Sequence, residues 1–233
     1  MKLIIDGIEI EIIKKDIKNL HLSVMPPNGR VRVSVPHGTS DESIEFFVRS
    51  KKAWIKSRRK MFDEQLRQSK RKYVSGETLF LWGEQFFLQV DYSNKGNCLT
   101  FDGNKAILVV RKESTAVQRA NFVDEELRKI LKQEIAKKLV HWEKKTGLTC
   151  AKWKTRIMKT HWGSFSDKTN TITFNLQLVK KPHKCLDYII VHELGHTKHR
   201  THGKQFIAHM DKHLPLWRET KTLLNGLTLD HID

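Results

Sequence analysis

Cysteine is scarce in this chain, and the few cysteines are not arranged in pairs. The sequence has three among 233 residues, Cys98, Cys150 and Cys185, and they lie far apart with no C-x-x-C spacing. Because disulfide frameworks are built from even sets of cysteines at regular spacings, an odd and scattered set argues against one. We therefore expect a protein of a reducing compartment, which favours a cytoplasmic location.

Long apolar runs are also absent. Asp6 interrupts the N-terminal segment before it reaches the length of a signal peptide. Nowhere does an uninterrupted apolar stretch approach the roughly 18 residues that a membrane-spanning helix needs. The sequence thus predicts a protein without a membrane span, and 233 residues are enough for a normal hydrophobic core in one large domain or two small ones.

Acidic residues are outnumbered by basic ones. Lysine and arginine number 43 against 26 aspartates and glutamates, which gives a formal net charge of +17. A charge of this size attracts polyanions, so nucleic acid and nucleotides are candidate partners. Much of the excess lies in residues 51–60 and 67–72, which is typical of solvated helix faces. No RNA-recognition, zinc-finger or basic-zipper pattern occurs, so a basic surface is the simpler interpretation.

The first half of the chain has mostly strand character. Apolar and charged residues alternate over 3–13 and 30–35, as in half-buried strands. Helical spacing with a basic face follows from Ser40, an expected N-cap, to Gln68. Strand character returns over 79–90 and over 98–110, where Asp102-Gly103 predicts a hairpin turn. We expect a β-rich N-terminal half with one basic helix.

The second half begins with a long amphipathic pattern over about 115–145, which should form a helix ending at Gly147. We take this helix as the domain boundary, with a β-rich region over 1–114 and a catalytic domain over 115–233. Two strand-like segments, 154–160 and 171–178, then precede a helix that carries the most informative motif. The predicted fold class is α+β.

That motif is His192-Glu193-Leu194-Gly195-His196, a complete H-E-x-x-H. On a helix, residues four apart lie one turn apart on the same face, so both imidazoles can bind one metal ion. Glu193 lies beside them without being a ligand. This spacing is typical of zinc metallopeptidases, in which the glutamate is the general base.

A catalytic zinc normally takes three protein ligands and leaves one position for water, so a third ligand is required. Four histidines follow the motif: His199, His202, His209 and His213. We favour His202, because Thr201 could cap a new helix that turns the chain back toward the metal. His199 would continue the first helix, and His209 and His213 are more simply interpreted as helix-surface residues.

These residues predict a hydrolytic mechanism. Zinc lowers the pKa of a bound water to about 7, and Glu193 would accept its proton and return it to the leaving group. A further donor would stabilise the oxyanion, and Arg156, His161 and Tyr188 are the candidates, although their spacing does not choose among them. Three imidazoles suit zinc well.

Several blocks together resemble the YgjP-like metallopeptidase-domain family, which is related more distantly to SprT-like and WLM-type zincins. They are NGRVRVSVPHGTSDESIEFFVRSKKAWI from Asn28, YVSGETLFLWG from Tyr73, KTHWGSFS from Lys159, TFNLQL with Asn175, PHKCLDYIIVHELGH from Pro182, and HGKQF from His202. The resemblance spans nearly the whole chain. It implies a zincin-like α+β catalytic domain, with His192, His196 and His202 as zinc ligands and Glu193 as the catalytic residue.

The chain departs from the family at one loop. The pattern R-W-G-S-C-S reads His161-Trp162-Gly163-Ser164-Phe165-Ser166 here, which leaves the expected ligands untouched. We expect Trp162 and Phe165 to pack against the catalytic helix and Gly163 to make the turn. The resemblance also implies a strand edge beside the metal that pairs with an extended substrate, and 171–178 is the expected strand.

Three functions follow from these observations. The first is a zinc metallopeptidase acting on a peptide or protein, with a substrate that could be associated with nucleic acid. The second is a metal-dependent nucleoside triphosphate hydrolase, for which no P-loop is present. The third is a basic nucleic-acid-binding module with a non-catalytic zinc, although structural zinc usually has four ligands, often cysteines, and only Cys185 lies near the helix.

Overall fold

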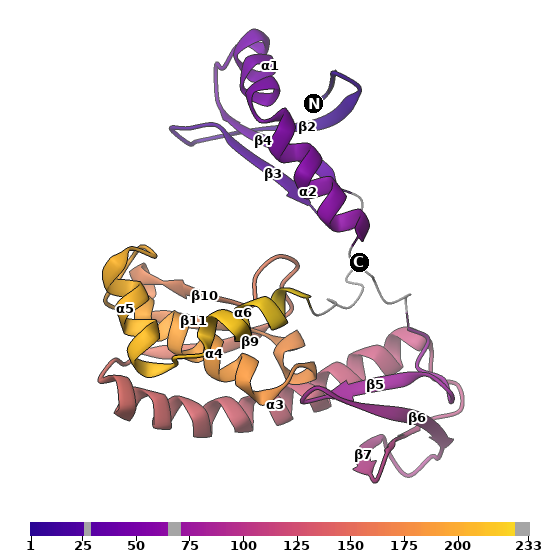
Figure 1. Ribbon diagram of the computed structural model, residues 1–233. Helices are drawn as coiled ribbons and strands as arrows, with labels where there is room; N and C mark the ends of the chain where they lie inside the picture. The colour runs from indigo at the N-terminus through magenta and orange to yellow at the C-terminus, as the bar shows by residue number, and fades with distance from the viewer. Residues whose placement is uncertain (26–28, 65–70, 227–233) are drawn as a thin grey trace. The chain divides into compact units, whose positions relative to one another are not determined.

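The computed structural model describes residues 1–25, 29–64 and 71–226 (Figure 1). The chain forms two compact units, one reaching residue 67 and the other starting at residue 68. Strands and helices are mixed in the first unit and again in the second, which confirms the expected α+β class. Within the described ranges, no helix is both long and apolar enough to cross a membrane.

The first unit is a four-stranded sheet followed by two helices. The strands have the order β1-β2-β4-β3, with β2 and β4 parallel and the two outer pairs antiparallel. Ile8, Ile10 and Ile12 are buried while Glu9 is exposed, so the alternation of the sequence separates a core face from a polar face. The elements are β1 (Lys2–Ile5), β2 (Ile8–Lys15), β3 (His21–Met25), β4 (Arg30–Pro36), α1 (Asp41–Ser50) and α2 (Lys52–Glu64).

The single basic helix expected after Ser40 is in fact two helices. Ser40 caps α1 as predicted, because its side chain accepts a hydrogen bond from the Ser43 backbone N–H. The first helix ends at Ser50 with Lys51 as its C-cap, and α2 then runs from Lys52 to Glu64. The last residues of the expected helix, 65–68, lie outside the described residues.

The second unit begins with another four-stranded sheet. The strands are β5 (Thr78–Leu81), β6 (Glu84–Tyr92), β7 (Cys98–Asp102) and β8 (Lys105–Val110), in the order β5-β6-β8-β7. The hairpin predicted at Asp102-Gly103 joins β7 and β8. The strand character of 79–90 divides into β5 and β6 around Trp82 and Gly83, whose φ angles of 51° and 90° suit a tight hairpin turn.

The long helix α3 (Ala116–Thr146) has the ends that the sequence predicts. Thr115 and Gln118 form a capping box, and Gly147 ends the helix in the left-handed conformation with φ 71°. The buried face of α3 includes Leu127, Leu131 and Ile135. These residues belong to one hydrophobic core with the sheet before the helix and the helices after it.

This shared core is why the division of the chain differs from the expected boundary at 114/115. The β5–β6 turn reaches the last part of the chain, where the Trp82 backbone N–H donates to the Val179 carbonyl at 2.7 Å. The Trp82 ring stacks on His183 with centroids 4.2 Å apart. Residues 71–114 therefore pack with the second half of the chain, and the boundary between the two units lies before them. The sequence did not show this because the contacts join residues that are far apart along the chain.

The remaining elements surround the helix that carries the motif. They are β9 (Lys152–Arg156), β10 (Gly163–Ser166), η1 (Asp167–Thr169), β11 (Thr171–Asn175), η2 (Leu176–Lys180), α4 (His183–His196), α5 (Lys204–His213) and α6 (Trp217–Gly226). The three strands have the order β10-β11-β9. Helix α4 packs against α3, against β10 and β11, and against α5 and α6 (Figure 1). Such packing on several sides holds α4 in a fixed position.

Candidate metal centre

Helix α4 presents the H-E-x-x-H motif from a largely buried scaffold. Leu186, Ile190 and Leu194 are fully buried on this helix, and they anchor it in the core of the second unit. His192 and His196 are half-buried one turn apart, whereas Glu193 is buried between helix and sheet. The amphipathic helix expected from the sequence is therefore present, and the tertiary packing fixes the direction of its polar face.

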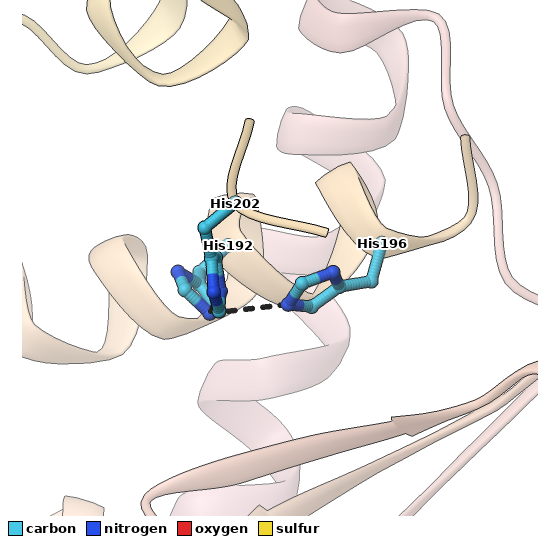
Figure 2. A group of neighbouring side chains, drawn as sticks. All are labelled: His192, His196 and His202. Atoms are coloured by element: carbon cyan, nitrogen blue, oxygen red, sulfur yellow. Dashed lines mark hydrogen bonds between the residues drawn. The ribbon is translucent and has the colours of Figure 1, made fainter. Parts of the chain in front are cut away.

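Three histidine side chains converge at this face (Figure 2). The Nε2 atom of His192 lies 3.3 Å from that of His196 and 3.1 Å from that of His202. One ring nitrogen from each of the three lies within 4.8 Å of the others. Of the four histidines that follow the motif, the structure thus brings His202 to the first two, as the sequence argument favoured.

This geometry fits a tetrahedral zinc site. With Zn–N bonds of about 2.0–2.1 Å, two ligand nitrogens on a tetrahedron lie roughly 3.4 Å apart. The 3.1 and 3.3 Å separations are close to that value. His196 Nδ1 lies 3.0 Å from the His199 carbonyl, and a proton held on Nδ1 leaves Nε2 free as a metal ligand. The donor set is therefore of the right type and spacing for a divalent metal ion.

The surroundings disfavour protonation of two of these imidazoles, those of His192 and His202. Burial lowers the pKa of His192 to about 3, with the positive charges of His196, His202 and Lys221 acting in the same direction. The pKa of His202 is lowered too, first by burial and then by the charges of His196 and Lys221. A neutral imidazole has the lone pair that a metal requires, so His192 and His202 are available as ligands at neutral pH.

Phe206 forms the apolar base under the three rings. Its ring centroid lies 4.9 Å from that of His192, 4.8 Å from His196 and 4.7 Å from His202. A Cβ at Gly195 would lie 3.0 Å from Phe206 Cε2, so a glycine at this point of α4 allows α5 to approach. The sequence showed this glycine inside the motif without revealing what it accommodates.

The backbone of β10 lies against Glu193. A Cβ at Gly163 would lie 2.6 Å from Glu193 Oε1 and 2.7 Å from Ile189 Cγ2, so only glycine fits here. Burial raises the pKa of Glu193 to about 8, while a hydrogen bond from the Phe165 backbone lowers it. The expectation that Gly163 makes a turn is wrong, because Gly163 begins β10 and is needed for the close contact with α4.

A family comparison identifies this chain. The model of the YgjP-like metallopeptidase domain matches residues 18–226. The chain belongs to this family. Metallopeptidases use a divalent metal ion, and the three converging histidines of this YgjP-like protein are the group that could hold it.

Two solved structures of archaeal enzymes are similar to parts of the YgjP-like chain. The abylysin zymogen of Pyrococcus abyssi has 23% identity and a TM-score of 0.38, covering 42% of this chain and 99% of its own. The jannalysin zymogen of Methanocaldococcus jannaschii has 25% identity and a TM-score of 0.35, covering 39% of this chain and 92% of its own. A comparison with curated proteins gives no match.

The three candidate substrate-contact residues differ in how close they lie to the site. Tyr188 is buried on α4, and its ring centroid lies 5.6 Å from that of His192. Arg156 and His161 are exposed, at the end of β9 and in the following loop. His161 Nδ1 pairs with the Thr160 hydroxyl, and in the described part of the chain no hydrogen bond or ion pair joins either residue to Glu193. Tyr188 is therefore the candidate that packs against the site.

Lys221 is a neighbour that sequence reasoning missed. It lies on α6, and its charge contributes to the lowered pKa of both His192 and His202. Its Nζ lies 5.8 Å from the Trp217 ring centroid, and Trp217 stacks on Tyr188 with an interplanar angle of 5°. No local motif marks this lysine, because it reaches the site only through the packing of α6 on α4.

The strand with a free edge beside the site is not the one expected from the sequence. β11 pairs with β10 on one side and β9 on the other, so it is the central strand and has no free edge. β10 is the edge strand that contacts α4. The side chain of Asn175 holds the connection before β10, because its Nδ2 donates to the carbonyls of Met158 and His161 at 2.9 and 2.8 Å.

The start of α5 requires a smaller correction. Thr201 was expected to cap a helix starting at His202, but α5 begins at Lys204 with Gly203 as its N-cap and no side-chain cap. His202 therefore lies in the connection between α4 and α5. Its imidazole still reaches His192, because Phe206 in the first turns of α5 packs against both rings.

Proposed function

We propose that this YgjP-like protein is a zinc-dependent metallopeptidase. His192, His196 and His202 hold the metal, and Glu193 is the general base. The observation that carries the proposal is the convergence of three Nε2 atoms beside a buried glutamate on one helix. Three imidazoles are a donor set that zinc prefers, and they leave a fourth position open.

When bound, zinc would polarise the scissile carbonyl and acidify the attacking water. Glu193 accepts the proton of that water and passes it to the leaving nitrogen. Its carboxyl group is suited to both steps, because burial raises its pKa to about 8, and a nearby cation would bring the pKa lower. The Phe165 backbone hydrogen bond holds the carboxyl group in a fixed direction.

An extended peptide would add to the edge of β10. This strand is the edge of its sheet and packs against α4, so a peptide paired with it would pass beside Glu193. Tyr188 is our candidate for oxyanion stabilisation, because burial and the charge of Glu193 raise its pKa to about 12 and keep its hydroxyl protonated. Lys221 would add a positive charge on the same side.

Metal content and peptide cleavage test the proposal together. We expect about one zinc per chain in the wild type and in Glu193→Gln, and much less in His202→Ala. Cleavage of a peptide library should fall by about 10²–10⁴-fold in Glu193→Gln, the range of general acid-base catalysis. Matched controls are Glu113→Gln and His141→Ala, which alter exposed residues.

The outcomes separate the candidate functions. Zinc-loaded protein that turns over nucleoside triphosphates but cleaves no peptide would contradict a peptidase. Wild-type protein that binds no zinc under metal-replete conditions would contradict the metal centre and favour a basic binding module. Equal loss of cleavage in Glu193→Gln and Glu113→Gln would remove the role of Glu193.

A further inference from the structure

A second group of histidines lies apart from the metal centre. It consists of His199, after α4, and His209 and His213 on α5. The ring centroids of His199 and His209 are 6.1 Å apart, and those of His209 and His213 are 4.8 Å apart. Together they line a cavity of about 280 Å³ between the ends of α3 and α4 and helix α5. His213 is buried, so the interpretation of His209 and His213 as helix-surface residues was wrong for His213.

The cavity is positively charged. Lys198 and Lys212 also line it, and none of its described lining residues is acidic. Across the described ranges, no ion pair joins either lysine to a carboxylate. The pKa of His213 is lowered by burial and by the charges of Lys212 and Lys145. An anion would relieve this repulsion, whereas a cation would increase it.

One polar atom inside this group has no partner. His209 Nε2 is buried and makes no hydrogen bond with any described residue, while the same side chain forms a hydrogen bond with the Val191 backbone. Buried polar atoms of this kind usually have a partner, such as a water or a bound ligand. The ring proton of neutral His209 is used in the bond to the Val191 carbonyl, so the donors that this cavity offers an anion are the ammonium groups of Lys198 and Lys212.

A second metal site is the competing interpretation, and two observations disfavour it. In the part of the chain that the structure describes, the single group of three ligand atoms within 4.8 Å is the one at His192, His196 and His202. In addition, Lys198 and Lys212 would repel a divalent cation, and no carboxylate compensates for them. Three histidines that lie beside two lysines, with no carboxylate nearby, form a poor cation site.

We propose that this cavity binds a phosphate group. A phosphate dianion matches the two ammonium groups of Lys198 and Lys212, and its charge-assisted hydrogen bonds to them would be strong. A volume of about 280 Å³ accommodates a single phosphate group with a small attached moiety. The phosphate is either free or part of a nucleic-acid backbone, which agrees with the net charge of +17.

The site adjoins the metal centre through the backbone. The His199 carbonyl accepts from His196 Nδ1, and His199 is also part of the cavity wall. A Cβ at Gly195 would lie 3.1 Å from His209 Cδ2, so this wall rests directly on the metal-binding helix. An anion held here therefore contacts residues that orient one of the three converging histidines.

Calorimetry with inorganic phosphate on the full-length, zinc-loaded protein tests the proposal at constant ionic strength. We expect one phosphate site whose affinity falls by about tenfold or more in Lys198→Gln/Lys212→Gln, because the substitutions remove both charge-assisted hydrogen bonds to the anion. The matched control, Lys132→Gln/Lys137→Gln, removes the same charge from exposed positions on α3 and should change the affinity by less than about twofold. Imidazole NMR signals of His209 and His213 should shift on phosphate addition.

Three results would overturn the proposal. The first is an equal loss of affinity in the two double variants, which would show attraction by net charge alone. The second is loss of phosphate binding in His202→Ala, which would place the anion at the metal centre. The third is a second zinc equivalent that binds more tightly in Lys198→Gln/Lys212→Gln, as expected for a cation site. Competition by a single-stranded oligonucleotide would identify backbone phosphate as the source, and its absence would identify free phosphate.

Discussion

The chemistry of Glu193 depends on the surroundings of its carboxyl group. Its side chain is only 4% exposed, and a buried carboxylate is costly without a partner or a nearby positive charge. The Phe165 backbone supplies a hydrogen bond, and the three adjacent histidines would hold a metal cation beside the carboxyl group. A carboxyl group with this balance can accept and release a proton near neutral pH, which is the property the proposed reaction needs.

Tyr188→Phe tests the oxyanion role of a single hydroxyl. Because the ring would still pack on His192 and Trp217, we expect zinc content and folding to be unchanged. The value of kcat should fall by about 10²–10³-fold, the usual effect of removing one oxyanion donor. Steady-state kinetics of peptide cleavage measure this, with the exposed Tyr92→Phe as control. Unchanged kcat would leave Tyr188 as a packing residue.

The cysteines should differ in reactivity. Cys98 is exposed, whereas Cys185 is fully buried and burial raises the pKa of its thiol to about 11. At pH 8 about one in 10³ molecules would have the Cys185 thiolate, and the fraction rises tenfold per pH unit up to the pKa. Mass spectrometry after brief iodoacetamide treatment should show alkylation of Cys98 before Cys185. Equal labelling of the native protein would contradict the buried position of Cys185.

At the scale of elements, the contact between β10 and α4 builds the site. The strand supplies a glycine where the helix comes closest and a backbone N–H for Glu193. Asn175 holds the preceding connection through the carbonyls of Met158 and His161. The close approach at Gly163 explains the W-G-S segment better than a turn does, because it sets the distance between strand and helix.

Gly163→Ala should therefore damage activity more than metal binding. The added methyl group would overlap Glu193 Oε1 at 2.6 Å and displace the carboxyl group or the strand. We expect zinc to be retained, the free energy of unfolding of the second unit to fall by about 1–3 kcal/mol, and cleavage to fall strongly. Gly226→Ala is the control, since no atom lies within 4 Å of its added Cβ. Full activity in Gly163→Ala would contradict the close contact.

At the scale of the whole molecule, the chain contains two separate hydrophobic cores. One is built from β1–β4 with α1 and α2, and the other extends from Tyr73 to Leu224. The metal centre belongs entirely to the second unit. A ligand that binds only there should stabilise that unit and leave the other unchanged.

Calorimetric scans with and without a chelator test this organisation. Removal of zinc should lower the Tm of the transition of the second unit and leave a separate transition of the first unit in place. The lost stabilisation is about 2.7 kcal/mol when the free metal is at 100 times its Kd. His202→Ala protein should show no response to the chelator. One transition that shifts as a whole would show that the two units unfold together.

Much of the local structure could be predicted from the sequence, because its physical causes are local. The capping box at Thr115 and the αL glycine at Gly147 define α3 from residues at its two ends. The helical period places His192 and His196 on one face, and the spacing to His202 allows a short connection to return to them. Each of these inferences needs only the geometry of one helix and a few adjoining residues.

The tertiary structure decided what depends on distant contacts. The position of β10 at the sheet edge, the approach of Lys221 on α6 and the division of the chain near residue 67 come from segments that meet only in the folded protein. Gly163 and Gly195 illustrate the limit, because a glycine in a sequence shows freedom of the backbone but not which side chain needs the space. Close packing between elements sets those distances, and the order of residues along the chain does not contain them directly.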